Sequence, residues 1–393
     1  MKILWISSLA WSFSNKYVYE VNGTGAVSGS LFQQAMIEGI EKNGHEVDII
    51  SDYPYKKIKL FHKEINWSHN DVAKDVIVRK IGLPYFSLIY KELEIQRVVK
   101  NKLKNKNYDV VVVYLIHYPF LKSLATIKKY AKNVKTILIC PDLPDMMDLS
   151  LKQKKFKSLL KKFDKSRIDK TYKNVDGYIL FAEKMKDKLP INNKPYTIIE
   201  GVASVENLNS DIKEKSKYIL HAGTLHKNNG IEEIIEAMNY VKNKEICLKI
   251  YGTGDLCQYI IDIGKNNPKI QFCGFIDRKE LFEKQKEALI LVNARNPNDD
   301  YTKYSFPSKT FEYLYSGTPF LTTKLEGIPK EYNQYLFMID NNDPISIANK
   351  IDYICENYEM CLEKSQEAKK FIIEMKNKEV QSQKLIDFIK NMR

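Results

Sequence analysis

The stretch YSFPSKTFEYLYSGTP, residues 304–319, predicts a short helix that begins at Pro307-Ser308. Proline suits the first turn of a helix because it cannot continue a preceding one, and serine is a good capping residue. The free N–H groups at such a start form an anion site, to which Ser308 adds a hydroxyl and Lys309 a positive charge. Glu312 follows about one turn later, so its carboxylate projects near the same end of the helix.

This combination of groups suits a nucleotide diphosphate. The phosphates would meet the helix start, and the Glu312 carboxylate would accept hydrogen bonds from a ribose diol. The alternative from the same residues is an N-capped helix whose Glu312 carboxylate is solvated.

Outward from this stretch, short apolar runs alternate with amphipathic helices along the whole chain. Strands are expected at residues 2–7, 46–51, 110–115, 136–140, 177–181, 218–221, 247–251, 270–275 and 289–292, with helices among others at 31–42, 230–241 and 307–316. Apolar strands separated by helices are typical of parallel sheets covered on both faces. The chain turns polar around residues 192–195, where we expect a linker that ends before Ser210. The pattern predicts two tandem doubly wound domains.

The charge is unevenly distributed between the two halves. The formal net charge is +13, yet residues 1–200 hold 35 basic and 21 acidic residues, and residues 201–393 hold 27 and 28. Hydrophobic residues make up 44% of the chain, which excludes an intrinsically disordered protein. The six cysteines have no CxxC spacing, so we expect reduced thiols rather than a zinc site or a disulfide framework. No secretory signal or membrane-length apolar run is visible, and we expect a cytoplasmic protein.

Residues 293–332 resemble the donor-binding domain of the family 4 glycosyltransferases, in the branch that builds bacterial cell-surface polysaccharides. The resemblance is carried by Asn293-Ala294-Arg295, the stretch from Thr302 to Lys309, Phe311-Glu312-Tyr313-Leu314, Ser316-Gly317-Thr318-Pro319 and residues 324–332. Weaker matches are Asn43 to Val47, His221-Ala222-Gly223-Thr224-Leu225, Gly252-Thr253-Gly254-Asp255 and Gly274-Phe275-Ile276.

The resemblance implies the GT-B fold, an α/β architecture in which two tandem doubly wound Rossmann-like domains face a cleft. Residues 1–197 would form the acceptor domain and residues 198–374 the nucleotide-sugar domain, with a C-terminal helix, about 375–393, crossing back to the first. The implied activity is retaining transfer from a nucleotide-diphosphate sugar, which serves as the donor substrate, and no cofactor is expected.

The resemblance also implies roles for single residues. Glu312 would hold the ribose, and Ser308 and Lys309 would lie against the diphosphate. His117 would touch the donor sugar, with a plain loop residue as the alternative. Gly25 would let the phosphates approach the backbone, unless it only makes a tight turn. Phe275 and Ile276 stand where the family has its nucleobase pocket.

Three positions depart from the family pattern. Tyr304 stands where the family's Glu-x7-Glu motif has its first Glu, and Thr224 and Asn229 stand where an Arg and a Lys are usual. A diphosphate leaving group needs positive charge or oriented donors, for which Lys227, Lys309 and Arg295 are the available substitutes. No Asp-x-Asp occurs, so metal-independent transfer is expected.

A second segment, residues 152–173, carries ten basic and two acidic residues among apolar ones at roughly helical spacing. A basic amphipathic helix is typical of a membrane-surface binder, here the inner face of the cell membrane. The alternative is a solvated basic face whose apolar stripe packs on its own domain. Nucleic acid is not expected because no recognised motif is present. Asp142 and Asp145 either contact the acceptor or lie in a solvated turn.

The sequence therefore predicts a glycosyltransferase that acts on a glycan or lipid-linked acceptor in capsule, exopolysaccharide or lipopolysaccharide synthesis. Two alternatives remain. One is a nucleotide-sugar epimerase or hydrolase on the same fold, and the other is a non-catalytic partner that has lost transfer.

Overall fold

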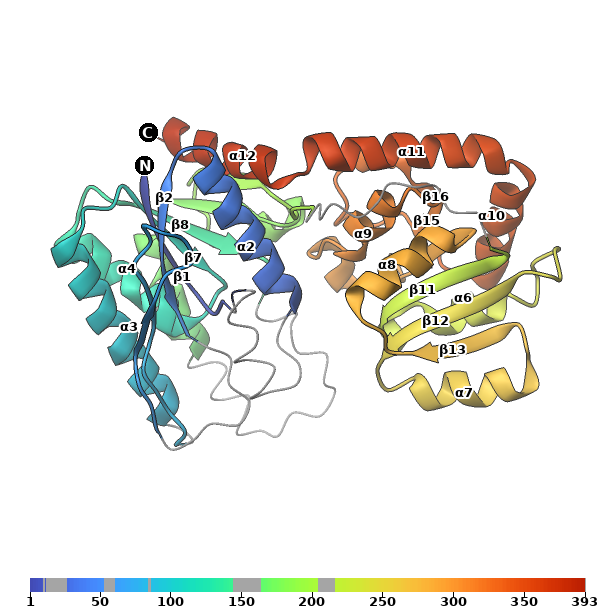
Figure 1. Cartoon of the computed structure of the whole chain (residues 1–393), viewed down its shortest axis with the longest axis horizontal. Coiled ribbons are helices and arrows are strands. Elements are labelled where there is room, and N and C mark those ends of the chain that lie inside the picture. The colour runs from blue at the N-terminus through green and yellow to red at the C-terminus, as the bar shows by residue number, and fades with distance from the viewer. Residues whose placement is uncertain are drawn as a thin grey trace. The chain divides into compact units, whose positions relative to one another are not determined.

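The computed structural model describes residues 1–9, 11, 27–52, 61–83, 86–143, 164–203 and 216–392. The chain folds into two compact units (Figure 1). Unit 1 comprises Met1–Ser204 and returns at the C-terminus with Lys378–Arg393, and unit 2 comprises Val205–Asn377.

Unit 1 is built on an eight-stranded sheet in the order β10-β9-β8-β7-β1-β2-β5-β4. The strands are β1 (Lys2–Ser7), β2 (Glu46–Ser51), β4 (Ile65–Trp67), β5 (Asp75–Ile77), β7 (Val110–Tyr114), β8 (Lys135–Cys140), β9 (Gly177–Leu180) and β10 (Tyr196–Ile198). Every neighbouring pair is parallel except β4 with β5. β3 (Phe61–His62) and β6 (Lys80–Ile81) form a separate antiparallel pair. All five residues of β7 are buried, as expected of a central strand with both faces covered.

Four helices of unit 1 are described over their length: α2 (Val27–Lys42), α3 (Phe86–Asn105), α4 (Tyr118–Tyr130) and α12 (Lys378–Asn391). The C-terminal helix α12 packs on α2 (Figure 1), and Leu385 and Ile389 join the core of unit 1. Gly39 makes this approach possible, since a Cβ there would lie 2.1 Å from the Lys378 carbonyl oxygen. Gly44, with φ +80°, ends the connection after α2 as the sequence predicts.

Unit 2 holds a six-stranded sheet, parallel throughout, in the order β13-β12-β11-β14-β15-β16. The strands are β11 (Tyr218–Thr224), β12 (Cys247–Thr253), β13 (Ile270–Gly274), β14 (Ile290–Asn293), β15 (Phe320–Thr323) and β16 (Phe337–Ile339). The helices are α6 (Ile231–Ala237), α7 (Cys257–Asn266), α8 (Arg278–Glu287), α9 (Lys309–Ser316), α10 (Pro344–Glu356) and α11 (Tyr358–Met375). The doubly wound α/β fold predicted from the sequence is thus observed.

Three predicted helices have other limits in the structure. The helix expected over 31–42 begins four residues earlier, at Val27. The helix expected over 230–241 is regular only from Ile231 to Ala237, and the one expected from Pro307 begins at Lys309. Among the described helices, none combines the length and the apolar character that a membrane span requires.

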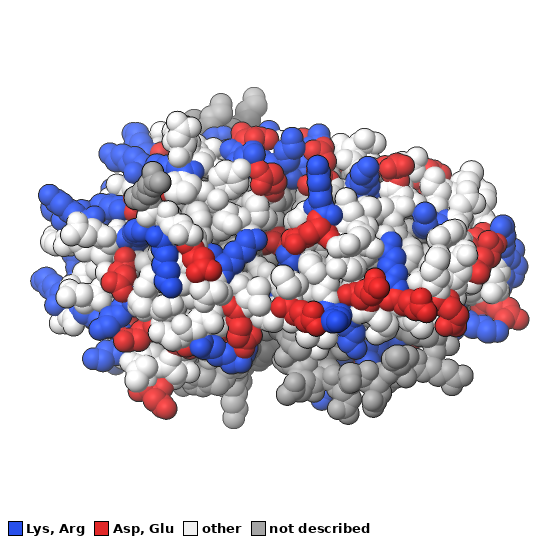
Figure 2. All heavy atoms as spheres, turned by 90° about the horizontal axis from the view of Figure 1, so that it is seen from above, with Lys and Arg blue, Asp and Glu red and all other residues white. Residues whose placement is uncertain are grey.

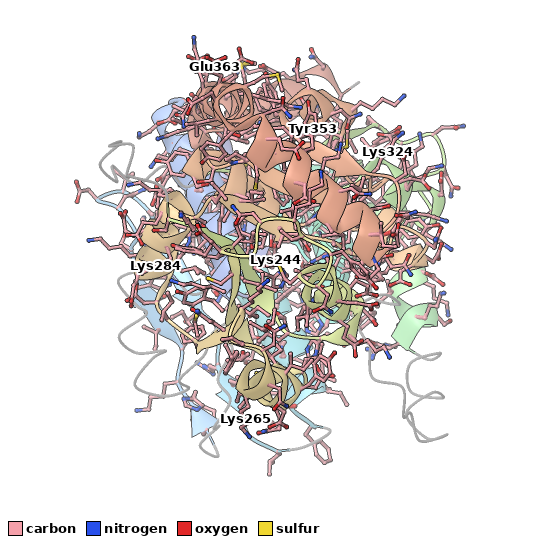
Figure 3. All side chains as sticks on the ribbon, turned by 90° about the vertical axis from the view of Figure 1, so that its right-hand side faces the viewer. Lys244, Lys265, Lys284, Lys324, Tyr353 and Glu363 are labelled. Atoms are coloured by element: carbon pink, nitrogen blue, oxygen red, sulfur yellow. The ribbon has the colours of Figure 1, made fainter. Side chains whose placement is uncertain are left out.

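Charged side chains cover much of both units. On the face shown in Figure 2, lysines and arginines are numerous over unit 1, whereas acidic and basic side chains are interspersed over unit 2. Figure 3 shows one face of unit 2, the right-hand side of Figure 1, with Lys244, Lys265 and Lys284 labelled on it. All six cysteines are free thiols.

A charged histidine is buried at the edge of the unit 1 sheet. The His69 ring lies between two carboxylates, with Nδ1 2.6 Å from Asp75 Oδ2 and Nε2 2.8 Å from Glu41 Oε1. The ring of Trp11 lies 4.8 Å away, between centroids. Burial favours the neutral ring, but the hydrogen bonds to Asp75 and Glu41 prevail and raise the pKa of His69 to about 9. His69 therefore links α2 to β5 as an imidazolium.

This cluster predicts that unit 1 loses stability as the pH rises. The folded-state pKa of His69 is about 9, above the unfolded value of about 6.5. The contribution is therefore complete below pH 6.5 and disappears as the pH passes through 9, a loss of roughly 3 kcal/mol. Urea unfolding followed by tryptophan fluorescence measures it, because Trp5, Trp11 and Trp67 all lie in unit 1.

The His69→Gln variant is the control, and its midpoint should vary less over the same range. Equal pH dependence of the two proteins would contradict the assignment.

Candidate functional site

The strand order of unit 2 reverses between β11 and β14. β12 and β13 lie on one side of this pair, and β15 and β16 on the other. In such sheets, ligands bind outside the carboxyl ends of the strands at the reversal. Thr224, Lys227 and Asn229 lie at the end of β11 or just after it, and Arg295 follows β14. The topology therefore brings four residues singled out from the sequence to the edge where a ligand is expected.

The turn after β11 is held in place by hydrogen bonds from side chains. Asn229 Nδ2 donates to the Thr224 carbonyl at 2.6 Å, and Tyr301 Oη donates to the Asn228 carbonyl at 2.8 Å. Gly230 has φ +72°, and a Cβ on it would lie 1.8 Å from the Ala294 carbonyl oxygen. This glycine lets the turn close against the end of β14. The Asn229 amide is thus engaged within the turn.

Lys227 and Arg295 differ in how firmly they are held. The Lys227 side chain is 80% exposed, with Glu232 at 3.8 Å. Arg295 is half-buried, and its carbonyl accepts a hydrogen bond from Thr323 Oγ1 on β15 at 2.6 Å. The backbone of Arg295 is therefore anchored to β15, and Arg295 is less exposed than Lys227.

The first turn of α9 brings Lys309 and Glu312 together. Lys309 Nζ lies 2.7 Å from Glu312 Oε2, and Arg278 Nε on α8 lies 3.6 Å from Glu312 Oε1. Both members of the Lys309–Glu312 pair are about one-quarter exposed. An ammonium has three protons and a carboxylate several lone pairs, so the pair keeps capacity for a ligand. Sequence reasoning missed Arg278, for which the only signal was its place at the start of a helix after Gly274.

Ser308 does not cap α9 with its side chain. Its backbone is already helical, with φ −55° and ψ −27°, and no side-chain capping hydrogen bond forms. The predicted capping role is wrong, because a capping side chain reaches back to the helix N–H groups from an extended backbone. The Ser308 side chain is instead exposed at the helix start.

A buried histidine that the sequence did not single out as a site residue lies beside these groups. His221 Nδ1 lies 3.0 Å from the Val292 carbonyl oxygen. Burial lowers the pKa of His221 to about 4, and the charges of Lys309 and Arg295 act in the same direction. The neutral ring therefore donates from Nδ1, and Nε2 has no hydrogen-bond partner within the described ranges. A polar residue in an otherwise apolar strand was the available signal.

The other predicted site residues of unit 2, Tyr304, Phe275 and Ile276, lie after two different elements. Tyr304 is half-buried directly after the 3₁₀ turn Asp300–Lys303. Phe275 follows β13 and is 77% exposed, and Ile276 is partly buried. An exposed aromatic ring at a strand end is open to stacking, so the nucleobase role of Phe275 stays a prediction.

In unit 1, His117 precedes α4 at the carboxyl end of the central strand β7. β7 neighbours β1, and the strand order of unit 1 reverses between these two strands. His117 therefore lies at the position in unit 1 that corresponds to the end of β14 in unit 2. Gly25, Asp145 and residues 152–163 lie outside the described residues. Asp142 is exposed after β8.

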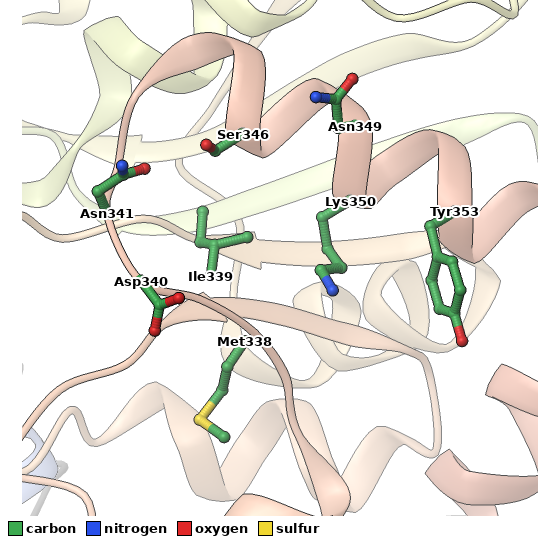
Figure 4. Close-up of a pocket in the computed structure, with 8 residues that line it drawn as sticks. All are labelled: Met338, Ile339, Asp340, Asn341, Ser346, Asn349, Lys350 and Tyr353. Atoms are coloured by element: carbon green, nitrogen blue, oxygen red, sulfur yellow. The ribbon is translucent and has the colours of Figure 1, made fainter.

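A pocket of about 360 Å³ opens in unit 2 between the end of β16 and α10. Figure 4 shows Asp340, Ser346 and Lys350 around it, with Tyr353 at one side. None of the predicted site residues lines this pocket. Among the described residues, no three His, Cys, Asp or Glu side chains gather as a metal site.

Comparisons with known proteins concern the family and the fold. Residues 206–371, nearly all of unit 2, match the family model described as "Glycosyl transferases group 1". No curated protein sequence matches the chain.

Solved structures match over the whole length of the chain. They include sucrose-phosphate synthase from Thermosynechococcus elongatus, with 13% identity, a TM-score of 0.69, and 99% of this chain and 98% of that chain covered. The catalytic domain of starch synthase IV from Arabidopsis thaliana, bound to ADP and acarbose, has 9% identity, a TM-score of 0.67 and coverage of 100% and 99%. The lipopolysaccharide outer core galactosyltransferase WaaB, in its apo form, has 11% identity, a TM-score of 0.65 and coverage of 99% for both chains. The GT-B fold is confirmed.

Proposed function

We propose that this chain, whose residues 206–371 belong to the glycosyl transferases group 1 family, transfers a sugar from a nucleotide-diphosphate sugar to a glycan or lipid-linked acceptor. The observation that carries the proposal is the start of α9, where Lys309 and Glu312 lie side by side close to the reversal of the strand order. Unit 2 would bind the donor, and unit 1 the acceptor.

The donor would bind with its diphosphate against cations and its ribose against Glu312. Lys309 and Arg295 offer positive charge, and the N–H groups that begin α9 and the Ser308 hydroxyl offer further donors. Glu312 would accept hydrogen bonds from the ribose diol while its salt bridge to Lys309 persists. Charge develops on the diphosphate as the sugar leaves, so fixed donors at this place lower the barrier.

The transfer would be retaining and independent of a metal ion. The cations named above are the groups that would meet the charge of the leaving diphosphate, and the sequence has no Asp-x-Asp motif. His117 would contact the transferred sugar from unit 1. We name no protein nucleophile and no catalytic base.

One observation favours a second candidate, a non-catalytic partner of the same fold. The Asn229 amide is bound to the Thr224 carbonyl, so the turn after β11 presents no charge at this position. Tyr304 likewise replaces a carboxylate of the family motif. A protein that binds the nucleotide and transfers nothing would fit both departures.

The protein would act in the cytoplasm, at an anionic membrane surface. It would take part in the synthesis of capsule, exopolysaccharide or lipopolysaccharide. The basic segment 152–173 belongs to unit 1. The same unit exposes apolar side chains at and before the start of α3, namely Leu83, Phe86, Leu88, Ile89 and Leu93, each more than two-fifths exposed. Basic charge and exposed apolar side chains together are what an interfacial surface needs.

A turnover assay tests the proposal directly. Thermal-shift screening with UDP-, GDP- and ADP-sugars first identifies the donor, because a ligand of the native state raises the apparent stability. Transfer to lipid-linked acceptors with that donor is then measured with and without EDTA. We expect equal rates in both. Loss in EDTA with recovery in Mg²⁺ would refute metal independence, and binding without turnover would favour the non-catalytic partner.

Glu312→Ala should weaken nucleoside diphosphate binding at least tenfold, since hydrogen bonds to a charged group contribute about 1.5–3 kcal/mol each. The same change releases Lys309 and Arg278 from their shared carboxylate, so affinity for inorganic pyrophosphate should hold or rise. Calorimetry with a nucleoside diphosphate and with pyrophosphate distinguishes a lost ribose contact, which affects only the first ligand, from a change in charge, which affects both. Glu363→Ala, exposed on α11 of the same unit, is the control.

Unchanged nucleoside diphosphate affinity in Glu312→Ala would refute the ribose assignment.

Replacing the basic residues of 152–173 by glutamine should release the protein from anionic vesicles. Each lysine or arginine near such a surface contributes about 1 kcal/mol, and the effect should shrink at high salt. The matched control replaces as many lysines of unit 2, Lys265 and Lys324 among them (Figure 3). Unchanged co-sedimentation of the 152–173 variant at low salt would exclude the membrane contact.

A further inference from the structure

The backbone before His117 holds this residue in a fixed position. Leu115 has φ +83°, a left-handed conformation that a leucine rarely adopts. Its N–H donates to the Ile139 carbonyl of β8 at 3.0 Å, and its own carbonyl accepts from the His117 N–H at 3.0 Å. The central strand therefore ends in a tight turn that is anchored to the next strand, and His117 follows this turn directly.

The His117 ring is fixed as well, by contacts on two sides. The Phe120 ring meets it edge to face, with the centroids 4.9 Å apart. Lys91 Nζ, on α3, lies 3.5 Å from His117 Nε2. An ammonium group is a hydrogen-bond donor only, so Nε2 of His117 must be the acceptor. The neutral ring therefore carries its proton on Nδ1.

Lys91 is in turn fixed by Asp52, the residue that follows β2. Lys91 Nζ forms an ion pair with Asp52 Oδ2, and the side chains of Lys91 and Asp52 are only 16% and 5% exposed. Lys80 Nζ, on β6, lies 3.7 Å from the other carboxylate oxygen. A mostly buried ion pair of this kind leaves the ammonium little freedom to turn away from the imidazole.

The electrostatic surroundings keep the imidazole uncharged. Burial, together with the charges of Lys91 and Lys80, lowers the pKa of His117 to about 4, against the opposing effect of Asp52. These three groups come from α3, from β6 and from the end of β2. At neutral pH the ring is therefore neutral, and its Nε2 lone pair faces an ammonium.

We propose that Lys91, anchored by Asp52, is a positioning residue that fixes His117 as a hydrogen-bond donor through Nδ1. This inference rests on the proposed function, because it takes His117 to meet an oxygen of the sugar substrate. The ring would donate to that oxygen and would not remove a proton, since the Nε2 lone pair is directed at Lys91. A base needs its lone pair within reach of the proton that it takes.

The tautomer can be measured without any substrate. The chain has six histidines, so ¹⁵N-histidine labelling of the full protein gives few signals. His117 should show the neutral form with the proton on Nδ1 at pH 7. His221, whose Nδ1 faces the Val292 carbonyl, should show the same form, and His69 should be doubly protonated. A proton on Nε2 of His117 in the wild-type protein would overturn the proposal.

Two substitutions of Lys91 separate positioning from charge. Lys91→Met removes the donor to Nε2, so His117 should shift toward the Nε2-protonated form. Lys91→Gln keeps an N–H donor without the charge and should retain the wild-type tautomer. Lys104→Met, on the exposed side of the same helix, is the matched control. An unchanged His117 spectrum in Lys91→Met would overturn the part assigned to Lys91.

Kinetics supply the second readout. Lys91→Met should lower kcat about tenfold, the worth of one hydrogen bond, and Lys91→Gln should recover most of it. Nucleotide affinity should stay constant in both, because the donor nucleotide belongs to unit 2. Equal kcat in Lys91→Met and wild type would overturn the substrate contact. Absence of transfer with every donor would instead refute the proposed function, and the tautomer measurement would still decide how His117 is held.

Discussion

The parallel arrangement of the strands is the constraint on which the site depends. Parallel strands deliver all their carboxyl ends to one edge of a sheet, and the chain must leave that edge in a loop. In each unit the strand order reverses beside the first strand, at β1 and β7 and at β11 and β14. Residues far apart in sequence, such as Thr224 and Arg295 in unit 2, therefore lie at the ends of neighbouring strands.

The fold was predictable because its signals are local. β1 and β2 have the limits expected from their apolar runs, and Gly44 ends the turn after α2 as predicted. Short strands were missed, both at the sheet edges (β4, β10 and β16) and inside the sheets (β5 and β15). An edge strand of three residues buries too little apolar surface to leave a periodic pattern.

The site was predictable only in part. The spacing of residues in the sequence indicates which side chains are neighbours on one helix or strand, but not which side chains meet between different elements. The one-turn separation of Lys309 and Glu312 is local, and the two do lie together. The contacts of Glu312 with Arg278 and of His117 with Lys91 join different helices and strands. The helix start also moved by two residues, which left Ser308 helical and unable to cap. Tertiary packing decides the contacts between separate elements, whereas helix ends commonly shift by one or two residues.

Three histidines show how far the surroundings determine the chemistry of one side chain. His69 lies between two carboxylates and is held charged, whereas His117 and His221 are buried near cations and held neutral. The same burial penalty acts on all three, so the sign of the neighbouring charge decides. The net charge of a unit therefore does not predict the charge around a single side chain. Unit 2 has a nearly balanced composition, yet Lys309, Arg295 and Arg278 lie at or near the carboxyl edge of its sheet because of where its strands end.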